Sequence, residues 1–158
     1  MTLARIVSGG QTGVDRGALD AALDAGFPCG GWCPQERLAE DGAIPARYPL
    51  AELSGGYKER TLRNVLETDG TAVFYFGELE GGTHQTVSYC QQHRKPCELL
   101  NAAQLTPEQC ALELAAFIAR HGIAALNVAG PRASKVPQAH GFAYAAIKAL
   151  ILASRERS

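Results

Sequence analysis

The stretch LARIVSGGQTGVDRGALDAALDAG, residues 3–26, decides the fold. Its apolar start predicts a short strand over residues 3–8, which ends at two adjacent glycines. Small apolar residues then recur at helical spacing over residues 13–25. Gly26 stands where a glycine commonly ends a helix. The stretch therefore predicts a strand, a glycine-rich loop and a helix, which is the first unit of an α/β fold.

Four further units of strand and helix follow along the chain. We expect strands at residues 28–33, 71–76, 97–100 and 124–128, and helices at residues 57–67, 83–93, 106–122 and 142–154. This alternation predicts a Rossmann-like, doubly wound α/β fold, in which one domain spans residues 1–158 and helices cover both faces of a parallel five-stranded sheet. We expect the flavodoxin-like strand order 2-1-3-4-5. Residues 34–56 show no sustained period, which fits either a functional lid or an irregular surface loop.

Composition limits the environment and the partners of the protein. The formal net charge of −1 gives no general attraction to nucleic acid or to an anionic membrane. No apolar run approaches the roughly 20 residues that span a bilayer, and the N-terminal residues lack a signal-peptide pattern. The five cysteines are scattered and odd in number, and Cys29 and Cys33 lack the partners of a zinc site. We therefore expect a cytoplasmic protein with reduced thiols and no bound metal.

Two glycine-rich loops follow the first and third predicted strands. In the expected strand order these loops meet at the point where the order reverses, which is the usual ligand site of such sheets. Glycines let backbone N–H groups approach an anion, and a helix N-terminus adds unpaired donors. The alternative is two tight turns with capping threonines. The predicted phosphate contacts are Gly9, Gly10, Gln11, Thr12, Gly13, Gly81, Gly82, Thr83 and Thr86.

Other polar residues are expected around this site. Arg37, Gly130, Arg132 and Ser134 are predicted as further contacts to the anion.

Asp15 opposes that expectation, because a carboxylate at a helix start repels a phosphate placed on the same donors. It either completes a capping box with Thr12 or holds an amine, a hydroxyl or a metal ion of the ligand. Asp15, Asp41 and His84 are the candidates for acid–base chemistry.

Several motifs in order resemble those of one known family. They are SGGQTGVDRGALDAAL (8–23), GWCP (31–34), AEDGAIPARYPL (39–50), DGT (69–71), GGTHQT (81–86) and NVAGPRAS (127–134). The chain resembles the molybdenum cofactor carrier proteins over nearly its whole length. That family is a circularly permuted branch of a superfamily that includes the lysine-decarboxylase-like nucleoside phosphoribohydrolases and the DNA-processing Smf proteins.

The resemblance implies a Rossmann-like fold, homo-oligomers and a pocket for molybdenum cofactor or a nucleotide. Residues 81–86 are similar to the phosphate loop of the phosphoribohydrolases, but Thr86 stands where their catalytic glutamate would be. The expected function is therefore a carrier of a phosphate-bearing small molecule, with molybdenum cofactor as cargo. The alternative is a hydrolase or transferase that acts on a nucleotide or an ADP-ribose-like substrate.

Overall fold

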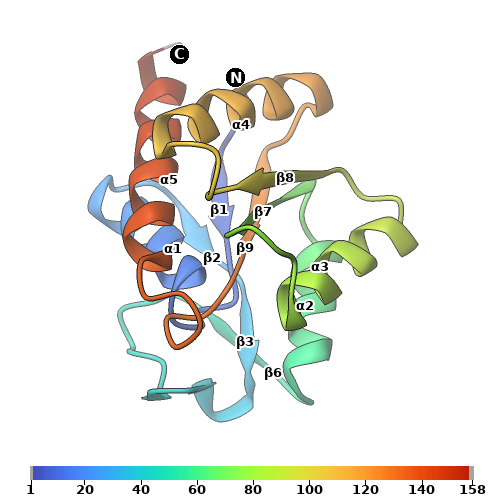
Figure 1. Ribbon diagram of the computed structural model, residues 1–158. Helices are drawn as coiled ribbons and strands as arrows, with labels where there is room; N and C mark the ends of the chain where they lie inside the picture. Colours follow the sequence, from blue (N-terminus) through green and yellow to red (C-terminus); the bar gives the residue numbers. More distant parts are fainter. Residues whose placement is uncertain (1, 157–158) are drawn as a thin grey trace.

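The computed structural model describes residues 2–156 and is built on a parallel five-stranded sheet (Figure 1). Residues 1, 157 and 158 of the predicted domain lie outside the described residues. The strands, in sheet order, are β2 (Cys29–Gly30), β1 (Arg5–Val7), β9 (Ala125–Ala129), β7 (Gly70–Tyr75) and β8 (Cys97–Asn101). The Rossmann-like α/β fold expected from the alternating pattern is thus confirmed.

The expected strand order is wrong. The last strand, β9, is not at the edge but pairs with β1 on one side and with β7 on the other. In the expected numbering the order is 2-1-5-3-4. The burial pattern fits a central position of β9 in the sheet. Leu126, Asn127 and Val128 are all buried, as in a parallel strand that helices cover on both faces.

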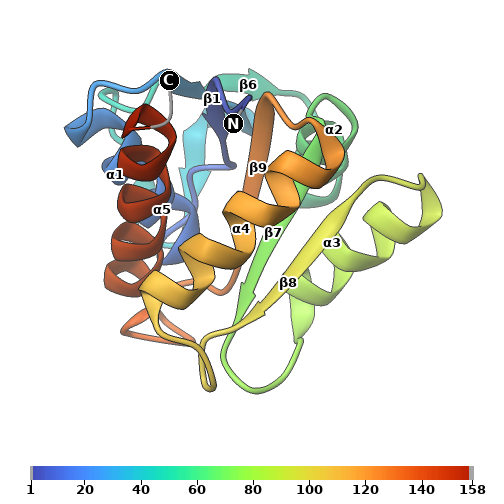
Figure 2. The same ribbon diagram turned by 90° about the horizontal axis from the view of Figure 1, so that it is seen from above.

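Helices cover both faces of the sheet. Figure 2 shows α1 (Val14–Asp24), α4 (Pro107–His121) and α5 (Ala139–Glu156) on one face, and α2 (Tyr57–Leu66) and α3 (Gly81–Gln92) on the other. Small residues let α1 and α5 approach closely, since Ala18, Ala21 and Ala22 in α1 face Ala143 and Ala146 of α5 within one buried cluster. A capping box at Thr106 and Gln109 fixes the start of α4.

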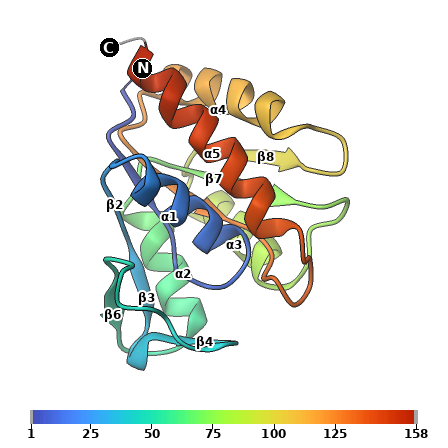
Figure 3. The same ribbon diagram turned by 90° about the vertical axis from the view of Figure 1, so that its left-hand side faces the viewer.

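The segment after β2 is more ordered than its sequence indicates. Residues 34–56 contain a 3-10 turn (Gln35–Arg37), the antiparallel pair β4 (Leu38–Ala39) and β5 (Gly42–Ala43), and β6 (Ala51–Leu53). The predicted strand at 28–33 divides into β2 and β3 (Trp32–Pro34), and β3 pairs with β6 in a second small sheet. Figure 3 shows β3, β4 and β6 grouped at one end of the molecule, beside α2.

The start of α1 differs from the expected capping box. Gly13, not Thr12, is the N-cap, and no side-chain cap bond forms there. The Thr12 hydroxyl instead donates to the Glu40 carboxylate and accepts the N–H of Ala133. The Asp15 carboxylate accepts the backbone N–H of Gln11 at 3.2 Å. Tertiary contacts to other loops therefore replace the local cap.

Gly13 also brings two distant turns together. It has φ 83°, and a Cβ there would lie 2.3 Å from the carbonyl oxygen of Pro131. We expect Gly13→Ala to lower the free energy of unfolding by about 2 to 4 kcal/mol, because it combines left-handed strain with a backbone clash. Gly141→Ala is the control, since a Cβ at Gly141 meets no atom within 4 Å. Chemical denaturation measures both, and equal stability of the two variants would contradict this description of the turn.

Candidate functional site

A cavity of about 510 Å³ opens at the carboxyl ends of β7 and β9. Its volume lies within the usual range of small-molecule sites. Its wall comes from the β1–α1 turn, α2, the β7–α3 connection with the start of α3, and the β9–α5 loop. The lining residues are Gln11, Asp15, Tyr57, Arg60, Thr61, Tyr75, Phe76, Glu78, Glu80, Gly81, Gly82, Thr83, Gln85, Thr86, Ala129, Gly130, Pro131, Arg132, Lys135 and Val136.

The position of this cavity follows from the corrected strand order. The helix after β9 lies on one face of the sheet and the helix after β7 lies on the other (Figure 2). The two connections thus diverge between neighbouring strands, which leaves a crevice at their carboxyl ends. The switch point is between β9 and β7, whereas the sequence placed it between the first and third strands. The two glycine-rich loops still border one cavity, with the β9–α5 loop between them.

The glycines of the first loop serve protein packing. A Cβ on Gly9 would lie 1.9 Å from the Arg60 guanidinium, and one on Gly10 would lie 2.3 Å from the Leu50 side chain. With Gly13 against the Pro131 backbone, none of these three glycines lines the cavity. Of the first loop, only Gln11 is part of the wall.

The glycines of the second loop face open space. No atom lies within 4 Å of a Cβ built on Gly81 or Gly82, and both residues line the cavity. They form the first turn of α3, and their backbone N–H groups donate no hydrogen bond within residues 2–156. Unpaired donors at the positive end of a helix attract an anion. Thr83 and Thr86 are buried beside them.

Arg60 of α2 is the most unusual residue of the wall. Its side chain is only 13% exposed, and its nearest anionic partner is the Asp15 carboxylate, with Nη1 and Oδ2 separated by 3.7 Å. The Nε atom is buried without a partner, and the guanidinium makes no hydrogen bond within the described chain. Burial lowers the pKa of Arg60, although the carboxylate of Asp15 opposes that shift. A buried guanidinium with unused donors is suited to accept an anion.

Asp15 lies at the floor of the same cavity and is 5% exposed. Burial raises its pKa, while Arg60, the Gln11 N–H, the Ser8 hydroxyl and Arg132 all act in the opposite direction. The Gln11 amide next to it donates through Nε2 to the Leu38 carbonyl, and its buried Oε1 has no partner among the described residues. This part of the cavity therefore combines the Asp15 carboxyl group, the Arg60 guanidinium and the Gln11 amide, and each of them has unused hydrogen-bonding capacity.

The rim adds cations and aromatic rings. The Arg132 guanidinium lies 4.9 Å from the centre of the Tyr57 ring, so the β9–α5 loop contacts α2 across the cavity. Lys135 follows in the same loop. Phe76 lines the cavity, and the Phe142 ring packs edge-on against it, with the two ring centres 5.6 Å apart. The rim thus offers two positive charges and flat apolar surface, together with the exposed carboxylates of Glu78 and Glu80 from the β7–α3 connection.

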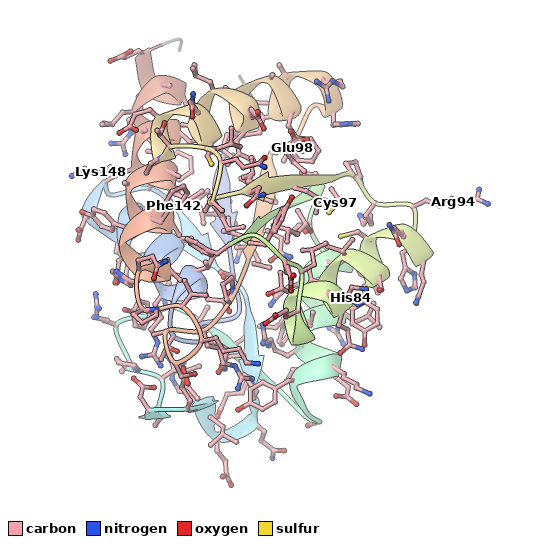
Figure 4. All side chains as sticks on the ribbon, viewed as in Figure 1. His84, Arg94, Cys97, Glu98, Phe142 and Lys148 are labelled. Atoms are coloured by element: carbon pink, nitrogen blue, oxygen red, sulfur yellow. The ribbon has the colours of Figure 1, made fainter. Side chains whose placement is uncertain are left out.

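Several predicted site residues lie outside the lining and have other partners. The Arg37 guanidinium donates to the carbonyl groups of Ile44, Pro45, Tyr48 and Leu50 and so closes the 37–50 segment on itself. His84 is exposed on the first turn of α3 (Figure 4).

The acidic pair of the long loop holds neighbouring turns. Asp41 forms a two-bond ion pair with Arg16, at 2.5 and 2.8 Å, and this partner lowers its pKa. The Glu40 carboxylate lies at the turns that contain Ser134 and Thr12, and hydrogen bonds from these two residues lower its pKa. These contacts attach the β4–β5 hairpin to the α1 and β9–α5 turns.

Tyr57 and Arg60 are not among the site residues that the sequence predicts. Both are in a helix that reads as amphipathic and charged, so Arg60 is not distinguishable there from its neighbours Lys58, Glu59 and Arg63. The available signal is the spacing of three residues, which places Tyr57 and Arg60 on one face of a helix. Only tertiary structure shows that this face turns toward Gly9.

The comparisons with known proteins identify the family. The profile of the circularly permutated YpsA SLOG family matches residues 6–151. The chain belongs to this family. It is also similar to the crystal structure of the "Putative molybdenum carrier protein" from Syntrophus aciditrophicus, with a TM-score of 0.92, 38% identity, and coverage of 95% of this chain and 96% of that chain. Comparison with curated proteins gives no match. The suspected resemblance to molybdenum carrier proteins is thus confirmed at the level of the family.

Two kinds of feature are absent from the described part of the chain, a membrane-spanning helix and a cluster of metal ligands. Within residues 2–156, no helix is long and apolar enough to cross a membrane. Over the same residues, no group of three or more His, Cys, Asp or Glu side chains is placed to hold a metal ion.

The hydrogen bonds of Arg37 predict a local effect on stability. We expect Arg37→Met to lower the free energy of opening of residues 38–50 by about 2 kcal/mol, because backbone acceptors lose a charged donor. Hydrogen exchange at the Ile44 and Leu50 amides measures this change. Arg37→Lys should not restore protection, because the ammonium group of lysine cannot form the same set of hydrogen bonds as the planar guanidinium. Arg120→Met, an exposed position on α4, is the control. Unchanged protection in Arg37→Met would contradict this role.

Proposed function

We propose that this protein is a binding or carrier protein for a phosphate-bearing small molecule. The observation that carries the proposal is the Arg60 guanidinium, which is buried in the cavity wall without a hydrogen bond. A buried donor left unsatisfied costs on the order of 1–3 kcal/mol, and more when it is charged. Phosphate oxygens would accept charged hydrogen bonds from the Nη groups of this guanidinium and so relieve part of that cost.

The anion would lie between Arg60 and the start of α3. The free N–H groups of Gly81 and Gly82 point to this location, and Arg132 and Lys135 supply further positive charge at the rim. The aromatic side chains of Tyr57, Tyr75 and Phe76 would contact the organic part of the ligand. The remaining predicted contacts, including Gly9, Gly10, Gly13 and Arg37, would then support the site rather than bind the ligand.

Molybdenum cofactor, a pterin phosphate, is the proposed cargo. The name of the Syntrophus aciditrophicus structure supports a molybdenum compound as ligand of that protein, and its similarity to this chain extends over nearly both lengths. The lining matches the two chemical parts of such a ligand, because Arg60 is suited to the phosphate and the rings of Tyr57 and Phe76 are suited to the pterin. A nucleotide combines the same two chemical parts and is the second ligand class.

A hydrolase acting on a nucleotide or an ADP-ribose-like substrate is the second candidate function. The buried Asp15 favours it, because a carboxyl group with a raised pKa can act as a general acid. Thr86 is the argument against it. Its hydroxyl donates to the Gly82 carbonyl at 3.0 Å within α3, so no carboxylate occupies the position where the related phosphoribohydrolases have theirs. Incubation with a panel of nucleotides, followed by chromatography, distinguishes the two functions, since only an enzyme releases product.

The second glycine loop gives a direct test of binding. Gly82→Asp places a carboxylate at the start of α3 in open space, so it should leave the fold intact and repel the anion. We expect the thermal stabilisation by guanosine monophosphate, adenosine monophosphate or isolated molybdenum cofactor to be lost in this variant. Gly141→Asp, an equally open position on α5, should keep the stabilisation that the wild type shows. Retained stabilisation in Gly82→Asp would exclude this loop as the phosphate site.

Arg60 gives an independent test of the same proposal. Arg60→Met should weaken the binding of these ligands by about ten- to a hundredfold, the effect of losing charged hydrogen bonds. Arg63→Met is the matched control, because Arg63 lies on the same helix but is 43% exposed and pairs with Glu67. Titration calorimetry measures the affinity, and circular dichroism verifies the fold. Equal affinity of both variants would contradict the proposal.

A further inference from the structure

The cavity holds a buried pair of opposite charges that form an ion pair without a hydrogen bond between them. Asp15 and Arg60 are separated by 3.7 Å, and both side chains are largely buried. Within residues 2–156, the one backbone donor to the Asp15 carboxylate is the N–H of Gln11. Asp15 therefore forms a buried ion pair with Arg60 that lacks the two hydrogen bonds by which Arg16 holds Asp41.

An anion on Arg60 changes the balance at Asp15. The anion would compete for the same guanidinium, and its negative charge would lie beside a buried carboxylate. Few other groups compensate. The charged groups that face Asp15 are Arg60 from α2 and Arg132 from the β9–α5 loop, with the Ser8 hydroxyl at the end of β1. Arg16, next to Asp15 on α1, is already paired with Asp41.

We propose that Asp15 couples ligand binding to proton uptake: when an anion binds Arg60, the Asp15 carboxylate takes one proton from solvent. The inference rests on the proposed function, since it requires an anion in this cavity. Free protein, anion and one proton combine to give the complex, and no bond of the ligand is formed or broken. In the free protein burial raises the pKa of Asp15 and the charge of Arg60 is the largest opposing influence, so an anion that neutralises Arg60 leaves burial unopposed.

The coupling fixes the sign of the pH dependence. The bound state carries more protons than the free state, so affinity rises as pH falls and declines as pH rises. Where a whole proton is taken up, the dissociation constant increases about tenfold for each pH unit. A carrier with this property holds its ligand more tightly in acid and releases it more readily in base.

Sulfate is the probe for this test, because it has the shape of phosphate but does not titrate near neutral pH. Any proton taken up on binding then comes to the protein. Titration calorimetry with sodium sulfate, in two buffers of different ionisation enthalpy, gives the number of protons bound per sulfate. We expect close to one proton for the wild type and for Asp24→Asn, a control on the same helix that lies outside the cavity. We expect no proton uptake and a pH-independent affinity for Asp15→Asn.

The outcomes separate this inference from the proposed function. Equal proton uptake in the wild type and in Asp15→Asn, or none in either, would overturn the role of Asp15 while leaving the anion site in place. A requirement for Mg²⁺ without proton uptake would overturn it as well, because a cation would then neutralise the carboxylate. Sulfate binding that is unaffected by Arg60→Met would contradict the proposed function itself.

Discussion

The close approach of two turns at Gly13 is the constraint on which the rest of the structure depends. The β1–α1 turn touches the β9–α5 turn backbone to backbone, with Val14 N–H donating to the Pro131 carbonyl. This contact accompanies the pairing of β9 with β1, and α5 packs on the alanine-rich face of α1. Because β7 is then the next strand, the helices after β9 and β7 diverge and the cavity opens between them.

Charge distribution explains why this cavity is suited to an anion. The wall contains Arg60, Arg132 and Lys135, and the first turn of α3 adds unpaired N–H groups. Three carboxylates oppose these cations: Glu78 and Glu80 are exposed, whereas Asp15 is buried and forms an ion pair with Arg60 at 3.7 Å. Burial makes each of these groups more sensitive to its neighbours than it would be at the surface. The affinity of the site for an anion therefore depends on the protonation state of Asp15 as well as on the number of cations.

Local patterns in the sequence predict most elements of the fold, and they do so for physical reasons. The apolar run of residues 71–76 indicates a central strand, and Gly26 and Thr106 mark helix ends through their backbone and side-chain chemistry.

The strand order is not predictable in the same way, because the pairing of β9 with β1 depends on contacts between residues about 120 positions apart. Arg60 was missed for a similar reason, since only the folded chain places it over Gly9. Conversely, the sequence predicts the glycines at 9, 10 and 13 as ligand contacts, and in the structure a Cβ on any of them would meet protein atoms.

The central claim is that the cavity between β7 and β9 holds a phosphate-bearing molecule. Mass spectrometry of the small molecules that co-purify with the native protein, combined with metal analysis for molybdenum, tests it most directly. The account predicts a phosphorus-containing compound that is present in the wild type and absent from Arg60→Met, with pterin and molybdenum if the cargo is molybdenum cofactor. A compound without phosphate, or one that Arg60→Met retains to the same extent, would contradict it.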